Sequence, residues 1–156
     1  MGEGRPSDED VDSVLRASRA LMGVVARSLT PALESVTLPQ FRVLVVLASS
    51  GPLPIGLLAS RLGAVASTFS RFVDRLEDTS LVEREPNPDS RREVLVRLTA
   101  KGEEMVREAT DRRRHAMAGV LERLTPEERA SLSNALDVFS AAADEPTPET
   151  LLVLGL

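Results

Sequence analysis

The sequence predicts a mainly α-helical fold with one small β hairpin. Apolar residues recur with helical spacing along most of the chain, and capping residues precede several of these segments. The one stretch with strand-like composition is interrupted by a turn rich in Pro, Asn, Asp and Ser. At 156 residues, the chain is long enough for a single domain with its own hydrophobic core.

The first predicted helix begins at Ser7, whose side chain is suited to cap a helix that opens with acidic residues. Its apolar stripe continues to Val36 and is longer than one small core requires, which suggests a partner helix. Pro31 lies inside this stripe. Because proline lacks the N–H that would bond to the Arg27 carbonyl, we expect the helix to kink or restart there.

Three shorter helices are expected in the middle of the chain. Residues 37–40 (Thr-Leu-Pro-Gln) have the spacing of a capping box, which predicts a helix over about 41–49. After a Gly-Pro break, a short helix is expected over about 54–62, ending at Gly63. A further helix follows over about 65–79.

A hairpin and two long helices complete the predicted fold. Residues 81–85 and 93–98 have the composition of strands and flank the turn-rich tip at 86–92. Thr99 is expected to cap a helix to about residue 123, and Thr125, followed by a proline and two glutamates, to begin a helix that ends near residue 143. After a Pro-rich linker, the apolar C-terminal end is expected to dock on its own or a partner subunit.

The composition excludes several classes of site. There are no cysteines, so a disulfide framework and a thiolate metal site are ruled out, and the single histidine leaves almost nothing for a zinc site or a histidine-based catalytic dyad. No motif for nucleophilic catalysis or phosphate binding is present, so we expect no catalytic residue, no metal, no cofactor and no enzyme activity. The absence of a signal peptide and of an 18-residue apolar run predicts a cytoplasmic protein without a membrane partner.

The order helix, Gly-containing turn, helix and hairpin is the layout of a winged helix-turn-helix. The second helix of the pair is predicted to bury one face and to present the opposite face to a DNA duplex. The buried face comprises Val65, Phe69, Phe72, Val73 and Leu76. The outward face comprises Ser67, Ser70, Arg71 and Asp74, with Arg75 on its flank. Short hydroxyl side chains allow close approach to DNA, and Arg71 can form two hydrogen bonds to a guanine in the major groove.

The hairpin tip supports DNA binding, because the guanidinium of Arg91 or Arg92 there can enter an electronegative minor groove. The acidic residues of the second helix are evidence against DNA binding, because Asp74, Glu77 and Asp78 would repel phosphates. The alternative is a winged-helix module that binds protein and has no affinity for DNA. A steep fall of affinity with salt would distinguish DNA binding from that alternative.

Residues 37–102 resemble the core of the multiple-antibiotic-resistance regulator (MarR) family of winged-helix transcription factors. Four stretches carry the resemblance. They are Leu58-Ala59 with Arg61-Leu62-Gly63; Ser67-Thr68 with Arg71 and Val73-Asp74-Arg75-Leu76-Glu77; Leu81-Val82-Glu83-Arg84; and Arg92 followed by Val94-Leu-Val-Arg-Leu98-Thr99 and Gly102. The last stretch is the most specific, because its spacing links the length of the wing to the start of the next helix.

The resemblance implies a homodimer that binds a pseudo-palindromic DNA operator and acts as a repressor. A small effector, with anionic aromatic molecules as one candidate class, is expected to release it. The resemblance also implies dimerisation helices over 7–36 and 99–144 and a DNA-binding lobe over 37–98 within a single domain, and the composition adds an apolar tail over 145–156. The side chains of Ser67, Thr68, Ser70 and Arg71 would face the major groove, and Arg91 or Arg92 would contact the minor groove.

Two positions depart from the family pattern. The family's wing has an Asp-x-Arg pattern at a fixed spacing from the next helix. In this chain Asp89 and Arg91 form that pattern one residue earlier than the family spacing. At the family spacing itself, the arginine position is occupied by Arg92. By the resemblance, Asp89 and Arg84 would support the wing. Ser80 stands where the family usually has a glycine after the recognition helix, a position whose left-handed backbone disfavours a side chain.

Arg113 is the most unusual residue outside the predicted DNA-binding lobe. It lies in the middle of an apolar stripe on the long helix after the hairpin. The stripe comprises Met105, Ala109, Ala116, Val120 and Leu124. Because burial of an unpaired charge is unfavourable, Arg113 is expected to form a salt bridge within or between subunits, or to anchor an anionic effector.

Overall fold

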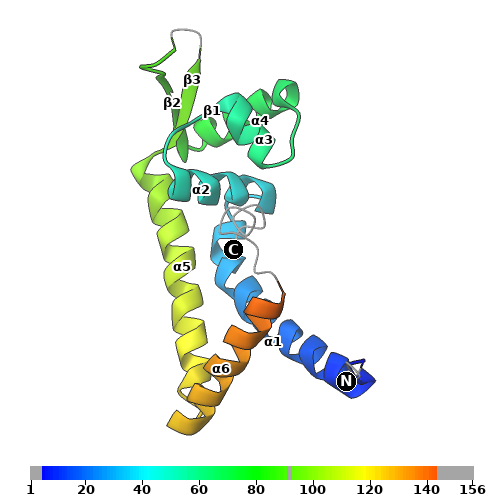
Figure 1. Cartoon of the computed structure of the whole chain (residues 1–156). Helices are drawn as coiled ribbons and strands as arrows, with labels where there is room; N and C mark the ends of the chain where they lie inside the picture. Colours follow the sequence, from blue (N-terminus) through cyan, green and yellow to red (C-terminus); the bar gives the residue numbers. More distant parts are fainter. Residues whose placement is uncertain (1–4, 91–92, 144–156) are drawn as a thin grey trace.

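The computed structural model describes residues 5–90 and 93–143, and within this part the side chains of residues 66–68 are not described. The hairpin, the short helices and α2 lie at one end of an elongated molecule, and the long helix α5 runs from that end to the other (Figure 1). The expected mainly α-helical fold with a small β wing is confirmed. The helices are α1 (Asp8–Leu33), α2 (Leu38–Ser50), α3 (Ile55–Arg61), α4 (Ala66–Asp78), α5 (Ala100–Leu121) and α6 (Pro126–Ala142), and the strands are β1 (Leu53–Pro54), β2 (Val82–Pro86) and β3 (Val94–Leu98).

The first helix begins where the sequence predicts, is not interrupted at Pro31, and ends before Val36, where the apolar stripe ends. Ser7 and Asp10 form a capping box, in which the Asp10 N–H donates to Ser7 Oγ at 3.2 Å and the Ser7 N–H donates to Asp10 Oδ2 at 3.0 Å. α1 then runs through Pro31 and ends two residues later, so the expected restart at this proline is wrong. Near the end of a helix only one hydrogen bond is lost, and packing of Leu29 and Ala32 in the core stabilises the last turn.

Helix α2 forms the centre of the core. Thr37 and Gln40 make the predicted capping box, and the helix that follows is apolar on nearly all sides. Five consecutive residues, Val43–Leu47, are buried, which places α2 between the long helices α1 and α5 and the rest of the lobe. Figure 1 shows α2 lying across the top of α1 and beneath α3 and α4.

The sheet has three strands in the order β1-β3-β2, all antiparallel, rather than the two expected. In the hairpin, Val82 pairs with Leu98 and Pro86 with Val94. The additional strand β1 pairs Leu53 with Val96. A two-residue strand has no alternating pattern of its own, and its pairing depends on a partner more than forty positions away in the sequence.

Helices α5 and α6 begin at the predicted caps. The Gly102 N–H donates to Thr99 Oγ1 at 3.2 Å, and Thr125 forms a capping box with Glu128. α1 packs along α5, and the Arg112 Nε–H of α5 donates to the Ser28 carbonyl of α1 at 3.2 Å. α6 has no buried residue among those described. α1 and α6 therefore leave much apolar surface uncovered.

Within residues 5–90 and 93–143, no single helix is both long and apolar enough to span a membrane; only α1 and α2 taken together, across a 97° bend, meet that requirement on length and composition.

Candidate nucleic-acid interface

Helices α3 and α4 are joined by a tight turn at Leu62–Val65. Gly63 in this turn has a φ of +65°, a conformation that favours glycine because a Cβ is strained there. Arg61, at the end of α3, donates to Ser50 Oγ of α2 at 2.6 Å. These contacts fix the start of α4 relative to the core helix.

The inner face of α4 is apolar, as predicted, with one exception. Phe69, Val73 and Leu76 are buried, and the rings of Phe69 and Phe72 stack with centroids 5.6 Å apart. Val65 was expected on this face but is 69% exposed. It is the N-cap residue in an extended conformation, so the helical spacing used for the prediction does not apply to it.

The outer face of α4 presents polar side chains to solvent. Arg71, Asp74 and Arg75 are exposed and Ser70 is half-buried, in agreement with the predicted orientation of the helix. Ser67 and Thr68 lie in the first turn of α4, and their side chains are outside the described residues. Arg71 and Arg75 are the described basic side chains that α4 offers to a partner.

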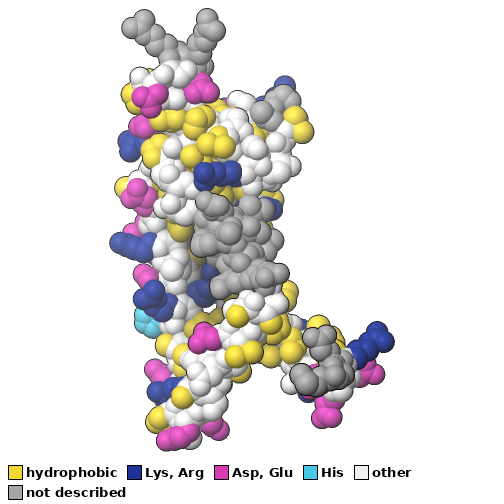
Figure 2. All heavy atoms as spheres, viewed as in Figure 1, with side chains coloured by type: hydrophobic (Ala, Val, Ile, Leu, Met, Phe, Trp, Pro, Cys, Tyr) yellow, Lys and Arg dark blue, Asp and Glu magenta, His cyan; other side chains and the backbone are white. Residues whose placement is uncertain are grey.

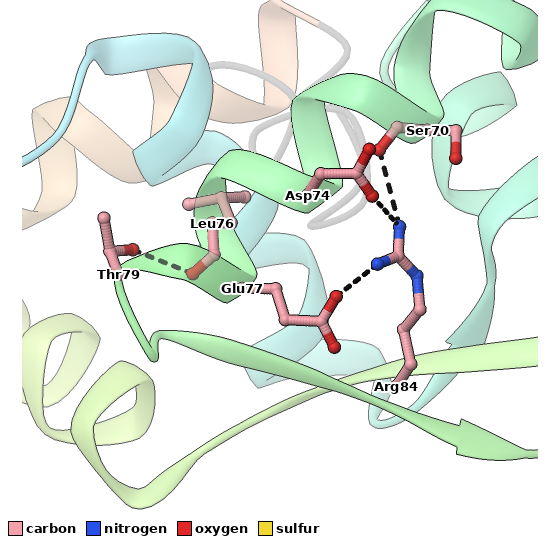
Figure 3. A network of polar contacts seen from close by, with 6 residues as sticks. All are labelled: Ser70, Asp74, Leu76, Glu77, Thr79 and Arg84. Carbon is pink, nitrogen blue, oxygen red and sulfur yellow. Dashed lines mark hydrogen bonds and ion pairs between the residues drawn. The ribbon is translucent and has the colours of Figure 1, made fainter.

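Two of the acidic residues on α4 are paired with Arg84 of β2 (Figure 3). Arg84 Nη2 lies 2.5 Å from Asp74 Oδ1 and 3.4 Å from the Ser70 carbonyl oxygen, and Nη1 donates to Glu77. Partial burial lowers the pKa of Arg84, but the hydrogen bond to Asp74 and the charges of Glu77 and Asp74 outweigh it, so the pKa lies above its usual value. Arg84 therefore stays charged and compensates the two carboxylates.

The resemblance assigned Arg84 to the support of the wing, but the sequence did not reveal that Asp74 and Glu77 are its partners. The spacing of the two carboxylates could have indicated part of this pairing. Asp74 and Glu77 are three residues apart and lie on the same side of a helix, where one guanidinium can reach both. The missing information was the position of β2 beside α4, which depends on tertiary packing.

The C-terminal end of α4 is held by the start of α5. Thr99 Oγ1 donates to the Ser80 carbonyl at 2.7 Å, and Lys101 Nζ donates to the Thr79 carbonyl at 2.8 Å. Ser80 has a φ of +57°, the left-handed conformation expected where the family usually has glycine. At Gly102, an added Cβ would overlap the Leu81 carbonyl oxygen, so the backbone of α5 approaches this turn as closely as a glycine permits.

The hairpin projects from the lobe at the end that carries α4 (Figure 1). Near its tip, the Asp89 N–H donates to Asn87 Oδ1 at 3.0 Å, and Asn87 Nδ2 donates to Glu93 at 3.1 Å. The Asp89 side chain is exposed. Arg91 and Arg92 lie outside the described residues, and with them the predicted brace between Asp89 and a wing arginine.

Arg113 lies on α5, outside the lobe, and is half-buried, as its place in the apolar stripe predicts. Burial lowers the pKa of its guanidinium below the usual value. Arg113 is therefore separate from α4 and the hairpin and lies among the long helices outside the lobe.

The fold and this surface define a class of protein, the winged helix-turn-helix. The family model of the MarR family matches residues 36–94. The regulator Mb0904 of Mycobacterium bovis, named as an HTH-type transcriptional regulator, is 34% identical over 133 residues, covering 85% of this chain and 89% of the relative. The repressor MdtR of Bacillus subtilis is 27% identical over 142 residues, covering 90% of this chain and 92% of MdtR.

The fold is also shared with solved structures. The crystal structure of RV1404 from Mycobacterium tuberculosis matches with a TM-score of 0.79 and 40% sequence identity, covering 91% of this chain and 98% of that protein. The chain belongs to the MarR family of transcriptional regulators. Members of this family are DNA-binding regulators and not enzymes, which confirms the expectation that this chain has no catalytic function.

Proposed function

We propose that the chain is a homodimeric repressor that binds a pseudo-palindromic DNA operator through α4 and the wing. The observation that carries this proposal is that the two ends of the molecule expose different kinds of side chain. One end bears α4, with Arg71 and Arg75 outward, and the hairpin. The other end exposes large apolar side chains on three helices.

The apolar surface at the second end supports dimerisation. Figure 2 shows hydrophobic side chains gathered where α6 crosses α1. A monomer rarely exposes so many large apolar side chains in one region, and a partner subunit would bury them. These residues are Val11, Val14, Leu15, Leu21, Met22, Val120, Leu121, Leu132, Leu136, Val138 and Phe139. In this proposal residues 7–36 and 99–144 form the dimer, residues 37–98 bind DNA, and residues 145–156 are an apolar tail.

The electrostatics of α4 support DNA as its partner. Three acids on α4 would repel phosphates if they were uncompensated, but Arg84 pairs with Asp74 and Glu77. The remaining exposed charges on the helix are Arg71, Arg75 and Asp78, a net positive balance. In this proposal Ser67, Thr68, Ser70 and Arg71 face the major groove, Arg75 contacts the backbone, and Arg91 or Arg92 enters the minor groove, with Asp89 and Arg84 supporting the wing.

The same pairing counts against a protein-interaction module without DNA affinity. That alternative requires an acidic recognition face formed by Asp74, Glu77 and Asp78. Because Arg84 already compensates two of these three carboxylates, a basic protein partner would gain little from them.

A ligand response and repression complete the proposal. The name of MdtR as a repressor supports repression. A small ligand would shift the population between dimers whose two α4 helices match the spacing of the operator and dimers in which they do not. Arg113, half-buried on α5, is proposed to contribute a salt bridge within or between subunits or to anchor an anionic effector.

Two measurements test the proposal. In a mobility-shift assay, the protein is expected to retard DNA that flanks its own gene, with affinity falling steeply on a log–log plot against salt. No retardation at low salt would contradict it. In light scattering, the wild type is expected to have the mass of a dimer and Phe139→Glu the mass of a monomer, while Leu57→Glu, an equally exposed apolar position on α3, is expected to stay dimeric.

A further inference from the structure

The recognition helix α4 ends in a turn that satisfies only part of its own backbone. The Ser80 N–H donates to the Glu77 carbonyl at 2.8 Å. The Leu81 N–H donates to the Leu76 carbonyl at 3.2 Å, and the Thr79 hydroxyl donates to the same carbonyl at 2.8 Å (Figure 3). With Ser80 in the left-handed conformation, this is the pattern of a Schellman motif. The carbonyls after the last helical turn need donors from another element.

Three consecutive carbonyls, those of residues 79–81, accept hydrogen bonds from the start of α5. Lys101 Nζ donates to the first of them, on Thr79, at 2.8 Å. Thr99 Oγ1 donates to the second at 2.7 Å, and the Thr99 N–H donates to the third at 3.1 Å. Residues at the start of α5 therefore supply the donors that the end of α4 lacks.

Lys101 differs from Thr99 in what it does for its own helix. Thr99 is the N-cap of α5, and its Oγ1 also accepts from the Gly102 N–H at 3.2 Å. The Lys101 side chain is exposed, and its amine reaches across to Thr79, the C-cap residue of α4. A positive charge beside the C-terminal end of a helix is also favoured by the helix dipole. Lys101 is thus the side chain of α5 that acts on α4 itself.

We infer that Lys101 is a positioning residue for operator recognition, whose ammonium ties the C-cap carbonyl of α4 to α5. The orientation of the recognition helix then follows that of α5. The inference rests on the proposed binding of DNA through α4. α5 packs along α1 and runs to the end of the molecule proposed for dimerisation (Figure 1). In a dimer, the spacing between the two α4 helices would therefore depend on this contact.

Two other roles for Lys101 give different results in the same measurements. If its ammonium contacted a DNA phosphate, removing it would lower the slope of log affinity against log salt by about 0.9. If it only stabilised the fold, removing it would lower the Tm and leave the preference among operator sequences unchanged. A positioning role predicts the opposite result in both measurements.

Lys101→Met is expected to weaken operator binding by at least about threefold, because the end of α4 loses a charge-assisted hydrogen bond. Discrimination against operators with single base changes is expected to fall, and the salt slope to stay at the wild-type value. Because the contact is exposed, the Tm is expected to fall by less than about 4 °C. Lys101→Arg keeps a charged donor and is expected to bind within about twofold of wild type. Arg114→Met, which removes an exposed charge in the middle of α5, is the matched control and is expected to bind as wild type.

Chemical acetylation provides a second test, because Lys101 is the only lysine of the chain. N-hydroxysuccinimidyl acetate modifies the Lys101 amine and the N-terminal amine of the folded protein. The acetylated wild type is expected to lose affinity as Lys101→Met does. Lys101→Arg treated in the same way reacts only at the N-terminus and is expected to keep its affinity. The result does not depend on whether Lys101→Met folds.

Hydrogen exchange of the protein without DNA tests the contact directly. In Lys101→Met, the amides of Ser80 and Leu81 are expected to exchange at least about threefold faster than in wild type, because the last turn of α4 opens more often. The Glu122 amide, which donates to the Ala118 carbonyl at the other end of α5, is expected to be unchanged. Since no operator is needed, failure of DNA binding and failure of this contact are distinguishable.

Five results would overturn the inference. Unchanged exchange at Ser80 and Leu81 would show that the contact does not hold the end of α4. Wild-type operator affinity in Lys101→Met, or an equal loss in Arg114→Met, would show that the contact has no specific effect on DNA binding. A salt slope lowered by about 0.9 would assign Lys101 to a phosphate. An equal loss in acetylated Lys101→Arg would assign the effect of acetylation to the N-terminus.

Discussion

Arg84 of β2 lies 2.5 Å from Asp74 of α4 and thereby joins the base of the wing to the middle of the recognition helix. The same guanidinium also pairs with Glu77 one turn further along. The contact has two consequences. It sets the angle between hairpin and helix, and it compensates two carboxylates on a surface that must approach DNA phosphates.

Replacing Arg84 by Met is expected to weaken operator binding by roughly tenfold, because two uncompensated carboxylates at about 6 Å from phosphates each cost on the order of 0.7 kcal/mol in a water-like dielectric. The loss of folding stability is expected to stay below about 1 kcal/mol, since the pair is partly exposed. Fluorescence anisotropy with labelled operator measures the first effect, and urea denaturation the second.

A triple variant separates charge from geometry at this site. Adding Asp74→Asn and Glu77→Gln to Arg84→Met is expected to recover most of the affinity, if compensation of charge is the main role of Arg84. Arg107→Met breaks a comparable ion pair with Glu104 on α5 and is expected to leave operator binding at the wild-type level. An equal loss in Arg107→Met would show that the effect is not specific to α4.

Arg71→Ala is expected to weaken operator binding by about 1–3 kcal/mol and to relax the preference for particular base pairs, because a bidentate contact to guanine is lost. Competition against operators with single base changes measures both effects. Arg123→Ala serves as the control for loss of one positive charge. A uniform loss across all sequences would assign Arg71 to a phosphate instead of a base.

Arg91→Ala and Arg92→Ala test which residue of the wing enters the minor groove. One of them is expected to weaken operator binding and lower its salt dependence, while the mass of the dimer stays unchanged. The affected residue identifies the minor-groove arginine. Wild-type affinity in both variants would remove the minor-groove contact from the proposal.

Gly102→Ala is expected to destabilise the fold by about 1–3 kcal/mol, because the new methyl group overlaps the Leu81 carbonyl and forces α5 away from the turn after α4. Gly119→Ala is the matched control on the same helix. Nothing lies within 4 Å of its added methyl group, so it is expected to stabilise by up to about 1 kcal/mol through helix propensity. Chemical denaturation at one fixed protein concentration compares the two, and a stable Gly102→Ala would contradict the close approach.

Ser80→Gly is expected to stabilise the protein by about 0.5–1 kcal/mol, because it relieves a left-handed backbone without removing the hydrogen bond that the Ser80 carbonyl accepts from Thr99. Ser131→Gly, in the interior of α6, is expected to destabilise by a similar amount. Thermal unfolding distinguishes the two directions, and a lower Tm for Ser80→Gly would be contrary to expectation.

Local features of this fold could be predicted from the sequence because their causes lie within a few residues. Ser7, Thr37 and Thr125 each cap a helix as expected, since a cap and its acceptor are three residues apart. The left-handed conformation of Ser80 was expected from the resemblance, because the family usually has a glycine at this place after the helix.

The features that were missed depend on distant residues or on the ends of elements. β1 exists only because Leu53 meets Val96, and the pairing of Arg84 with Asp74 needs β2 beside α4. Val65 was placed on the buried face by helical spacing, which fails at an extended N-cap. The buried Nε of Arg42, which has no hydrogen-bond partner among the described residues, could not be predicted either, because a missing partner is visible only when the neighbours are known.

Hydroxyl-radical footprinting of the protein on the DNA retained in the mobility-shift assay tests the central claim most directly. The account predicts two protected half-sites with centres about one helical turn, roughly 34 Å, apart, related by two-fold symmetry. Protection of a single half-site, or an unprotected duplex at low salt, would contradict a dimer that presents one α4 and one wing to each half of an operator.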